Sequence, residues 1–174
     1  SSVSSRWSAI SQAFFAAITG AARTITISTP HFIPSVALLE ALKVAALKGV
    51  DVRIVIPAKS DSRLVHLATC SFVDGLLSAG VKVYLYTAGF LHSKLIAVDG
   101  RMASVGTANM DIRSLEDNFE VSTFIYDREV VRQLSATLDD YISHSRRVMP
   151  DEWYGRSRGQ RMLEALARLF SPLL

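Results

Sequence analysis

Two side chains suited to phosphate chemistry stand two residues apart in the sequence. They are His92 and Lys94, in the segment FLHSKLIAVD that spans residues 90–99. Alternate side chains of an extended chain point to the same side, so we expect the imidazole and the ammonium to share a face. An ammonium neutralises non-bridging phosphate oxygens, and an imidazole attacks phosphorus or protonates the leaving oxygen. The pair therefore predicts a site for a phosphate ester.

A second polar cluster follows the next apolar strand and consists of Gly106, Thr107 and Asn109. The sequence Asp-Gly-Arg at 99–101 is a strong hairpin signal, so the two strands should lie side by side and bring this cluster near His92. Gly106 would permit close backbone approach, and Thr107 and Asn109 would donate hydrogen bonds to phosphate oxygens. The alternative is an ordinary turn that leads into a short helix near residues 110–115.

Two acidic residues have less certain places around this pair. Asp99 is seven residues after His92, which puts it on the opposite face of a straight strand, and a hairpin role explains it at least as well as a chemical one. Glu120 begins a later strand. Beside His92, it would fix the imidazole tautomer and stabilise the protonated ring.

His31 lies in a loop between two prolines, directly after a β-branched strand. Ligand contacts are common at this position in α/β folds, so His31 is a candidate for lining the substrate pocket. An ordered loop residue without a binding role explains it equally well.

Strands and helices alternate along the first half of the chain. This order predicts a single α/β domain over residues 1–174, with a mixed parallel and antiparallel sheet flanked by helices on both faces and an amphipathic tail at 150–174. The expected strands cover residues 24–29, 50–56, 81–86, 95–98, 102–105 and 119–126. The expected helices cover residues 7–22, 35–48, 63–79, 127–144 and 158–170.

The spacing His-x-Lys-x4-Asp, followed by Gly-Thr-Ala-Asn and then Asn-Phe-Glu, resembles the HKD motif of the phospholipase D superfamily. Other segments resemble the C-terminal half of bacterial cardiolipin synthases, and this similarity covers nearly the whole chain. They include TPHFIP at 29–34, KSDSRLV at 59–65 and NMDIRS at 109–114. Two departures stand out: Thr107 replaces a usual serine, and His31 stands where an aromatic residue such as tyrosine is common.

The resemblance implies a phospholipase D-like fold and an exchange in two steps. One motif's histidine forms a phosphatidyl-histidine, and the other's serves as general acid and base, with no metal and no cofactor. The catalytic residues implied are His92, Lys94, Asp99, Asn109 and Glu120. The substrate-binding residues implied are Gly106, Thr107 and His31.

Only one such motif is present, because of the four histidines only His92 is followed by a lysine two residues later. The resemblance implies that the second half-site comes from an N-terminal half of the same protein or from a homodimer partner. We expect a fragment of a longer protein, in which His92 is the general acid and base and the other half supplies the nucleophile. Trapping a covalent phosphatidyl adduct on His92 would contradict this assignment.

The leading hypothesis is a phosphatidyltransferase that condenses two phosphatidylglycerols into cardiolipin and releases glycerol. A homodimeric phosphodiesterase or nuclease of the same superfamily is the rival, although the Lys and Arg residues are scattered rather than gathered into a basic stripe. A third possibility is an inactive half that only binds its partner half. Nucleic acid is not a favoured partner.

The composition fits a domain at a lipid surface that it does not cross. The net charge is +3, hydrophobic residues make up 49% of the chain, and no apolar run reaches the length of a membrane span. A single cysteine excludes an internal disulfide. We expect a peripheral, cytoplasm-facing domain of a membrane-anchored protein at the bacterial inner membrane.

The last expected helix is amphipathic. Met162, Leu166 and Leu169 fall on one side, and Arg161 and Glu164 on another. Contact with anionic lipid headgroups is one interpretation, and docking against its own domain or the other half is the alternative.

Overall fold

The computed structural model describes residues 8–170, and a seven-stranded mixed sheet forms its centre. The strand order is β8-β6-β5-β1-β3-β4-β9. The parallel strands are β1 (Thr24–Ser28), β3 (Asp51–Pro57) and β4 (Lys82–Tyr86). The strands that pair antiparallel with their neighbours are β5 (Leu95–Val98), β6 (Met102–Gly106), β8 (Ser122–Ile125) and β9 (Ser145–Arg147). The predicted mixed sheet is confirmed, with β1 at the junction of its parallel and antiparallel halves.

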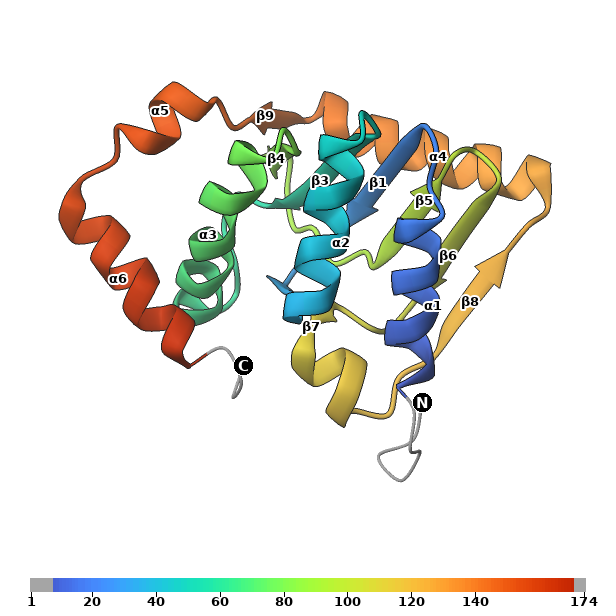
Figure 1. The fold of residues 1–174 in the computed structure, drawn as a ribbon, viewed down its shortest axis with the longest axis horizontal. Helices are drawn as coiled ribbons and strands as arrows, with labels where there is room; N and C mark the ends of the chain where they lie inside the picture. Colours follow the sequence, from blue (N-terminus) through green and yellow to red (C-terminus); the bar gives the residue numbers. More distant parts are fainter. Residues whose placement is uncertain (1–7, 171–174) are drawn as a thin grey trace.

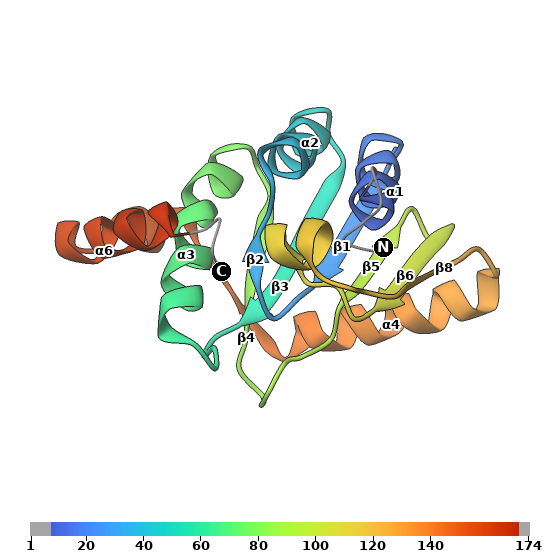
Figure 2. The same ribbon diagram turned by 90° about the horizontal axis from the view of Figure 1, so that it is seen from below.

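Helices cover both faces of this sheet, as predicted. One face carries α1 (Ala9–Thr19), α2 (Val36–Leu47) and α3 (Arg63–Ser78), whereas α4 (Arg128–Ser143) covers the other (Figure 2). Side chains cap three of these helices: Ser35 accepts from the N–H of Leu38, Ser62 caps α3, and Asp127 caps α4. The sequence then continues through α5 (Pro150–Tyr154) into α6 (Arg158–Leu169), which packs alongside α3 (Figure 1).

Alternating side chains of β5 divide the apolar core into two layers. Ile96 and Val98 belong to the large cluster on the side of α1 and α2. Leu95 and Ala97 belong to a smaller cluster with Leu138 of α4. The two-residue period of the strand thus joins both layers through a single short segment.

A second, two-stranded sheet lies outside the main one and corrects one expectation. β2 (Phe32–Ile33) pairs in parallel with β7 (Met110–Asp111). The sequence favoured a loop at β2, and the alternative of a short helix near residues 110–115 is wrong for its first residues. The N–H of Met110 donates to Thr29 Oγ1 at 3.1 Å, which holds this segment extended. A π-helix, η1 (Arg113–Asp117), begins two residues after Asp111, and the carboxylate of Asp111 accepts the N–H of Ser114 in its first turn at 2.6 Å.

None of the helices within residues 8–170 is both long enough and apolar enough to span a bilayer.

Candidate active site

The polar residues of the motif gather where β1, β3 and β6 end and where β5 and β8 begin. The antiparallel pairing of β5 with β6 places Leu95 opposite Val105. One residue further on, the N–H of Gly106 donates to the carbonyl oxygen of Lys94 at 3.3 Å. The predicted meeting of the two segments is therefore confirmed at Lys94 and Gly106, and contact of His92 with Thr107 or Asn109 stays a prediction.

His92 and Lys94 lie in extended chain just before β5. The residue between them, Ser93, turns toward β1, because its hydroxyl is 2.6 Å from the hydroxyl of Ser28. The ammonium of Lys94 donates to the carbonyl oxygen of His92 at 2.9 Å. The imidazole of His92 is exposed and stacks on Phe90, with ring centres 5.4 Å apart. His92 can therefore meet a substrate from outside the domain, while the neighbouring Lys94 is partly buried.

The charge of Lys94 is set by burial and by nearby carboxylates. Burial lowers the pKa of Lys94, and Glu120, Asp111 and Asp61 act in the opposite direction through their negative charges. An ammonium has three N–H donors, and the bond to His92 uses one of them. Donors on Lys94 can therefore reach a phosphate oxygen in a setting rich in carboxylates.

Thr107 and Glu120 are linked directly. The hydroxyl of Thr107 donates to Glu120 Oε2 and accepts the N–H of Val121 at 3.0 Å. These bonds fix the Glu120 carboxylate at the start of β8, close enough to act on the charge of Lys94. The further role expected of Glu120, which is to orient the imidazole of His92, stays a prediction.

His31 joins three of the loops around the site. Its Nε2 is 3.3 Å from Asp61 Oδ1, and its Nδ1 is 3.3 Å from Asn109 Nδ2 and 3.8 Å from Asp111 Oδ2. The nearby carboxylate of Asp111 raises the pKa of His31; burial opposes this effect and Asp61 adds to it. His31 thus lies among the motif residues, in contact with Asn109.

Asp99 lies at the opposite end of β5 from Lys94. Five residue steps in a strand span about 17 Å. The carboxylate of Asp99 accepts the backbone N–H groups of Ala22, Arg23 and Thr24, each at 2.8 Å. Although burial alone would raise it, these N–H donors lower the pKa of Asp99. The expected catalytic role of Asp99 is corrected: its strand carries it away from the site, and it holds the turn that precedes β1.

Gly106 has a structural role that the sequence did not suggest. A Cβ atom at this position would lie 2.2 Å from the carbonyl oxygen of Val121 and 2.7 Å from the Cα of Ser122. The close approach of β6 to the start of β8 therefore requires glycine here. The expected approach of Gly106 to a substrate stays a prediction.

Two functional candidates were not singled out from the sequence, Asp61 and Asp111. Asp61 follows β3 and Asp111 ends β7, and both contact His31. Asp61 could have been found from its position in the sequence, because it follows the carboxyl end of a parallel strand, where α/β sheets bind ligands. Among residues 8–170, no group of three or more His, Cys, Asp and Glu side chains has the arrangement of a metal site.

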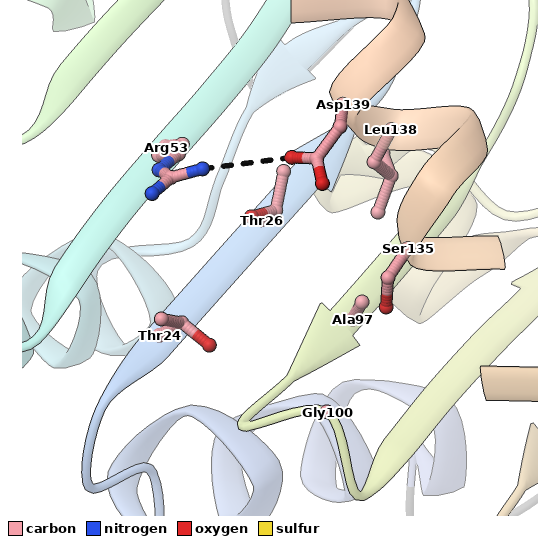
Figure 3. Close-up of a pocket in the computed structure, with 8 residues that line it drawn as sticks. All are labelled: Thr24, Thr26, Arg53, Ala97, Gly100, Ser135, Leu138 and Asp139. Carbon is pink, nitrogen blue, oxygen red and sulfur yellow. Dashed lines mark ion pairs between the residues drawn. The ribbon is translucent and has the colours of Figure 1, made fainter. Parts of the chain in front are cut away.

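A separate cavity of about 190 Å³ lies between the sheet and α4, away from these residues (Figure 3). Thr24 and Thr26 of β1 line it, together with Arg53, whose guanidinium is 3.6 Å from the carboxylate of Asp139. None of the motif residues that meet near His92 takes part in this lining.

Comparison with known proteins shows which family this chain resembles. Residues 14–142 match the family described as "Cardiolipin synthase, PLD-like domain". The chain is 47% identical to cardiolipin synthase 2 of Bacillus cereus over 169 residues, which are 97% of this chain and 33% of that protein. It is 45% identical to the major cardiolipin synthase of Bacillus subtilis, over 98% of this chain and 35% of that protein. The chain thus spans about a third of the length of these relatives.

Solved structures share the fold at low sequence identity. The Nuc protein of Salmonella typhimurium, a phospholipase D family member, aligns with a TM-score of 0.68 at 20% identity, over 79% of this chain and 89% of that one. Phosphatidylserine synthase of Haemophilus influenzae aligns with a TM-score of 0.70 at 16% identity, over 94% of this chain and 42% of that one. Together with the family match, these similarities show that the chain belongs to the phospholipase D-like domain family of cardiolipin synthases.

Proposed function

We propose that this domain supplies one of two His-Lys half-sites of a phosphatidyltransferase. The complete enzyme condenses two phosphatidylglycerol molecules into cardiolipin and releases glycerol. The observation that carries the proposal is the cluster of His92, Lys94, Thr107 and Asn109 at one sheet edge, in a chain 47% identical to a cardiolipin synthase. The lipid substrates place this activity at a membrane surface.

In the proposed first step, the histidine of the other half attacks the phosphorus of one phosphatidylglycerol. The bond between phosphorus and the glycerol headgroup oxygen breaks, and protonated His92 gives its proton to that oxygen. In the second step, His92 takes the proton from a hydroxyl of the second phosphatidylglycerol. That hydroxyl oxygen attacks phosphorus and displaces the histidine, so proton and leaving group balance over the cycle.

The remaining residues have supporting roles in this proposal. Lys94 and Asn109 bind non-bridging phosphate oxygens, and Thr107 holds Glu120 in place. Glu120 stabilises protonated His92 through its negative charge. When Nδ1 of His31 is unprotonated, it accepts a hydrogen bond from the Asn109 amide nitrogen at 3.3 Å and keeps Asn109 in position.

The carboxylates around Lys94 favour a lipid phosphodiester over a polynucleotide. Asp61, Asp111 and Glu120 all contribute negative charge there. A nucleic acid brings many phosphates and needs a surface that is positive over several of them. A single lipid phosphate needs only local donors, which Lys94 and Asn109 offer.

The decisive experiment measures transfer from labelled phosphatidylglycerol in mixed vesicles by this chain. It is run with the chain alone and with the N-terminal half of a cardiolipin synthase supplied in trans, and the products are separated as lipids. We expect labelled cardiolipin and released glycerol only when the second half-site is present. His92→Ala should reduce the rate by at least about a hundredfold, as expected for loss of a general acid and base.

Two results would contradict the proposal. An active homodimer of this chain that cleaves phosphodiesters without forming cardiolipin would favour the phosphodiesterase alternative. A covalent phosphatidyl adduct on His92 would keep the transferase but reverse the assignment of nucleophile and acid.

A further inference from the structure

The last helix, α6, is docked on the domain through its polar side. Glu164 faces inward and is only 3% exposed, and Ala167 is buried beside it. The carboxylate of Glu164 accepts from the Arg156 guanidinium at 2.5 Å and from Gln160 at 3.4 Å. The contact between α6 and the rest of the domain therefore consists of one small apolar side chain, Ala167, and a network of charged and polar groups.

Asp74 of α3 anchors this network from the other side. Its carboxylate accepts from the indole N–H of Trp153 at 2.5 Å and from Arg156 at 3.3 Å, and it lies 3.6 Å from the guanidinium of Arg161. The guanidinium of Arg168 lies 4.5 Å from the centre of the Phe72 ring, also on α3. These contacts set the rotation of α6 about its own axis.

The apolar side of α6 consequently faces away from the domain. Its large apolar side chains are 49–74% exposed: Met162, Leu163, Leu166, Leu169 and, directly after the helix, Phe170. A surface helix of a globular protein ordinarily turns this side toward the core. The alternative that α6 buries its apolar side against its own domain is therefore excluded, and this exposed apolar surface needs another environment.

The charges on α6 favour one environment in particular. Its only acidic residue, Glu164, is buried and paired with Arg156. The exposed charged residues of the helix are all basic: Arg158, Arg161 and Arg168. An exposed apolar face bordered by arginines, with no exposed carboxylate on the helix, is complementary to an anionic lipid surface.

The position of α6 agrees with such a surface. The C-terminal end of the helix lies on the same side of the molecule as β7, which follows Asn109 of the site (Figure 1). A helix of 12 residues is about 18 Å long, so it can lie flat along the headgroup layer.

We propose that the outward apolar face of α6 (Met162, Leu163, Leu166, Leu169 and Phe170) inserts into the interface of an anionic bilayer. The inward polar network keeps the helix attached to α3 while it does so. The domain thereby gains its own contact with the surface that holds its proposed substrate, independent of any other segment of a longer protein.

The test is binding of the chain to sedimenting vesicles, either phosphatidylglycerol-rich or pure phosphatidylcholine. All proteins carry His92→Ala so that lipid turnover plays no part. The first variant, Leu166→Gln with Leu169→Gln, removes the apolar face. A matched control, Val36→Gln with Leu47→Gln, changes two apolar residues of α2 that are 77% and 71% exposed.

We expect the parent protein to bind phosphatidylglycerol vesicles at least tenfold more tightly than phosphatidylcholine vesicles. The α6 variant should lose at least tenfold in binding, and the α2 control should stay within twofold of the parent. Circular dichroism and thermal unfolding check that all three are folded.

Three results would overturn the proposal. The first is equal binding by the α6 variant and the α2 control, and the second is equal binding of the parent to both lipids. The third is a dimer of the parent that the α6 variant dissociates while vesicle binding stays unchanged, which would make a second copy the occupant. Failure of the transferase assay would leave this binding result intact, because binding is measured without turnover.

Discussion

At the residue scale, Asp99 shows that a residue of the motif can stabilise the fold. Its side chain accepts three backbone N–H groups before β1, and its own N–H donates to Thr24 at 2.9 Å. Its φ of 55° suits aspartate and asparagine better than most other residues. Asp99→Asn therefore keeps the backbone conformation and removes the negative charge.

We expect Asp99→Asn to lower the free energy of unfolding by about 1–3 kcal/mol, because it weakens hydrogen bonds to a charged acceptor. The pKa of Asp99 is lowered by folding, so this contribution is present above pH 3.8 and is lost as the pH falls below it. Urea unfolding at pH 7 and pH 3 measures both effects. If Asp99→Asn leaves the stability unchanged but greatly lowers the transfer rate per folded molecule, Asp99 has a chemical role after all.

His31 predicts a pH dependence of the opposite sign. Its pKa is raised by folding, mainly through Asp111, so its stabilising effect is fully present below pH 6.5 and is lost as the pH rises through the higher folded value. The difference in unfolding free energy between the parent and His31→Gln should therefore shrink from pH 5.5 to pH 8.5. A difference that is constant or grows with pH would contradict this origin.

A double-mutant cycle assigns that dependence to its partner. In the Asp111→Asn background, His31→Gln should lose most of its pH dependence, because the carboxylate that holds the proton on His31 is gone. An unchanged dependence would point to Asp61 instead.

At the element scale, the contact between β6 and the start of β8 controls the position of Glu120. Gly106→Ala would place a methyl group 2.2 Å from the Val121 carbonyl oxygen, so the two strands must separate. We expect a loss of about 3 kcal/mol or more in unfolding free energy and a reduced transfer rate. Gly75→Ala is the matched control, because this helical glycine has open space at its Cβ position and should gain about 0.5–1 kcal/mol. A Gly106→Ala protein as stable as the parent would refute the close approach.

Long elements were predictable because their patterns are local. The continuous apolar run at residues 95–98 and the helical spacing of apolar residues at 35–48 predicted β5 and α2 correctly, with a difference of one residue at each end of α2. The strands β2, β7 and β9 were not predicted, since two or three residues carry no periodic pattern. Their conformation depends on partners far along the chain, such as Thr29 for Met110.

The site was predictable to the extent that its residues form a motif. The spacing of His92 and Lys94 and the hairpin signal at Asp99 brought the correct segments together. Asp61 and Asp111 were missed because their importance comes from contacts with His31 across three separate loops. The structural role of Gly106 was missed because the strand that crowds it begins 16 residues later, at Ser122.

At the scale of the whole molecule, α6 adds only Ala167 to the apolar core that the sheet and the other helices share, and its remaining attachment is polar. Asp74→Ala removes the acceptor shared by Trp153 and Arg156. We expect backbone amides in α6 to exchange with solvent at least tenfold faster, while those of β1 and β3 keep their protection. Hydrogen exchange with mass spectrometry measures both regions. Equal acceleration in the sheet would show that α6 and the core unfold as one unit.

The central position of β1 also has a consequence for the order of folding. The β5–β6 hairpin joins neighbouring segments of the chain, whereas the contact of His31 with Asn109 spans 78 positions and that of Ala22 with Asp99 spans 77. Closing such long loops costs more chain entropy than forming a hairpin. We therefore expect the hairpin to form early in the transition state for folding, and the two ends of β1 to be tied last. The sheet edge that carries His92 and Lys94 would then be completed only when the whole chain has folded.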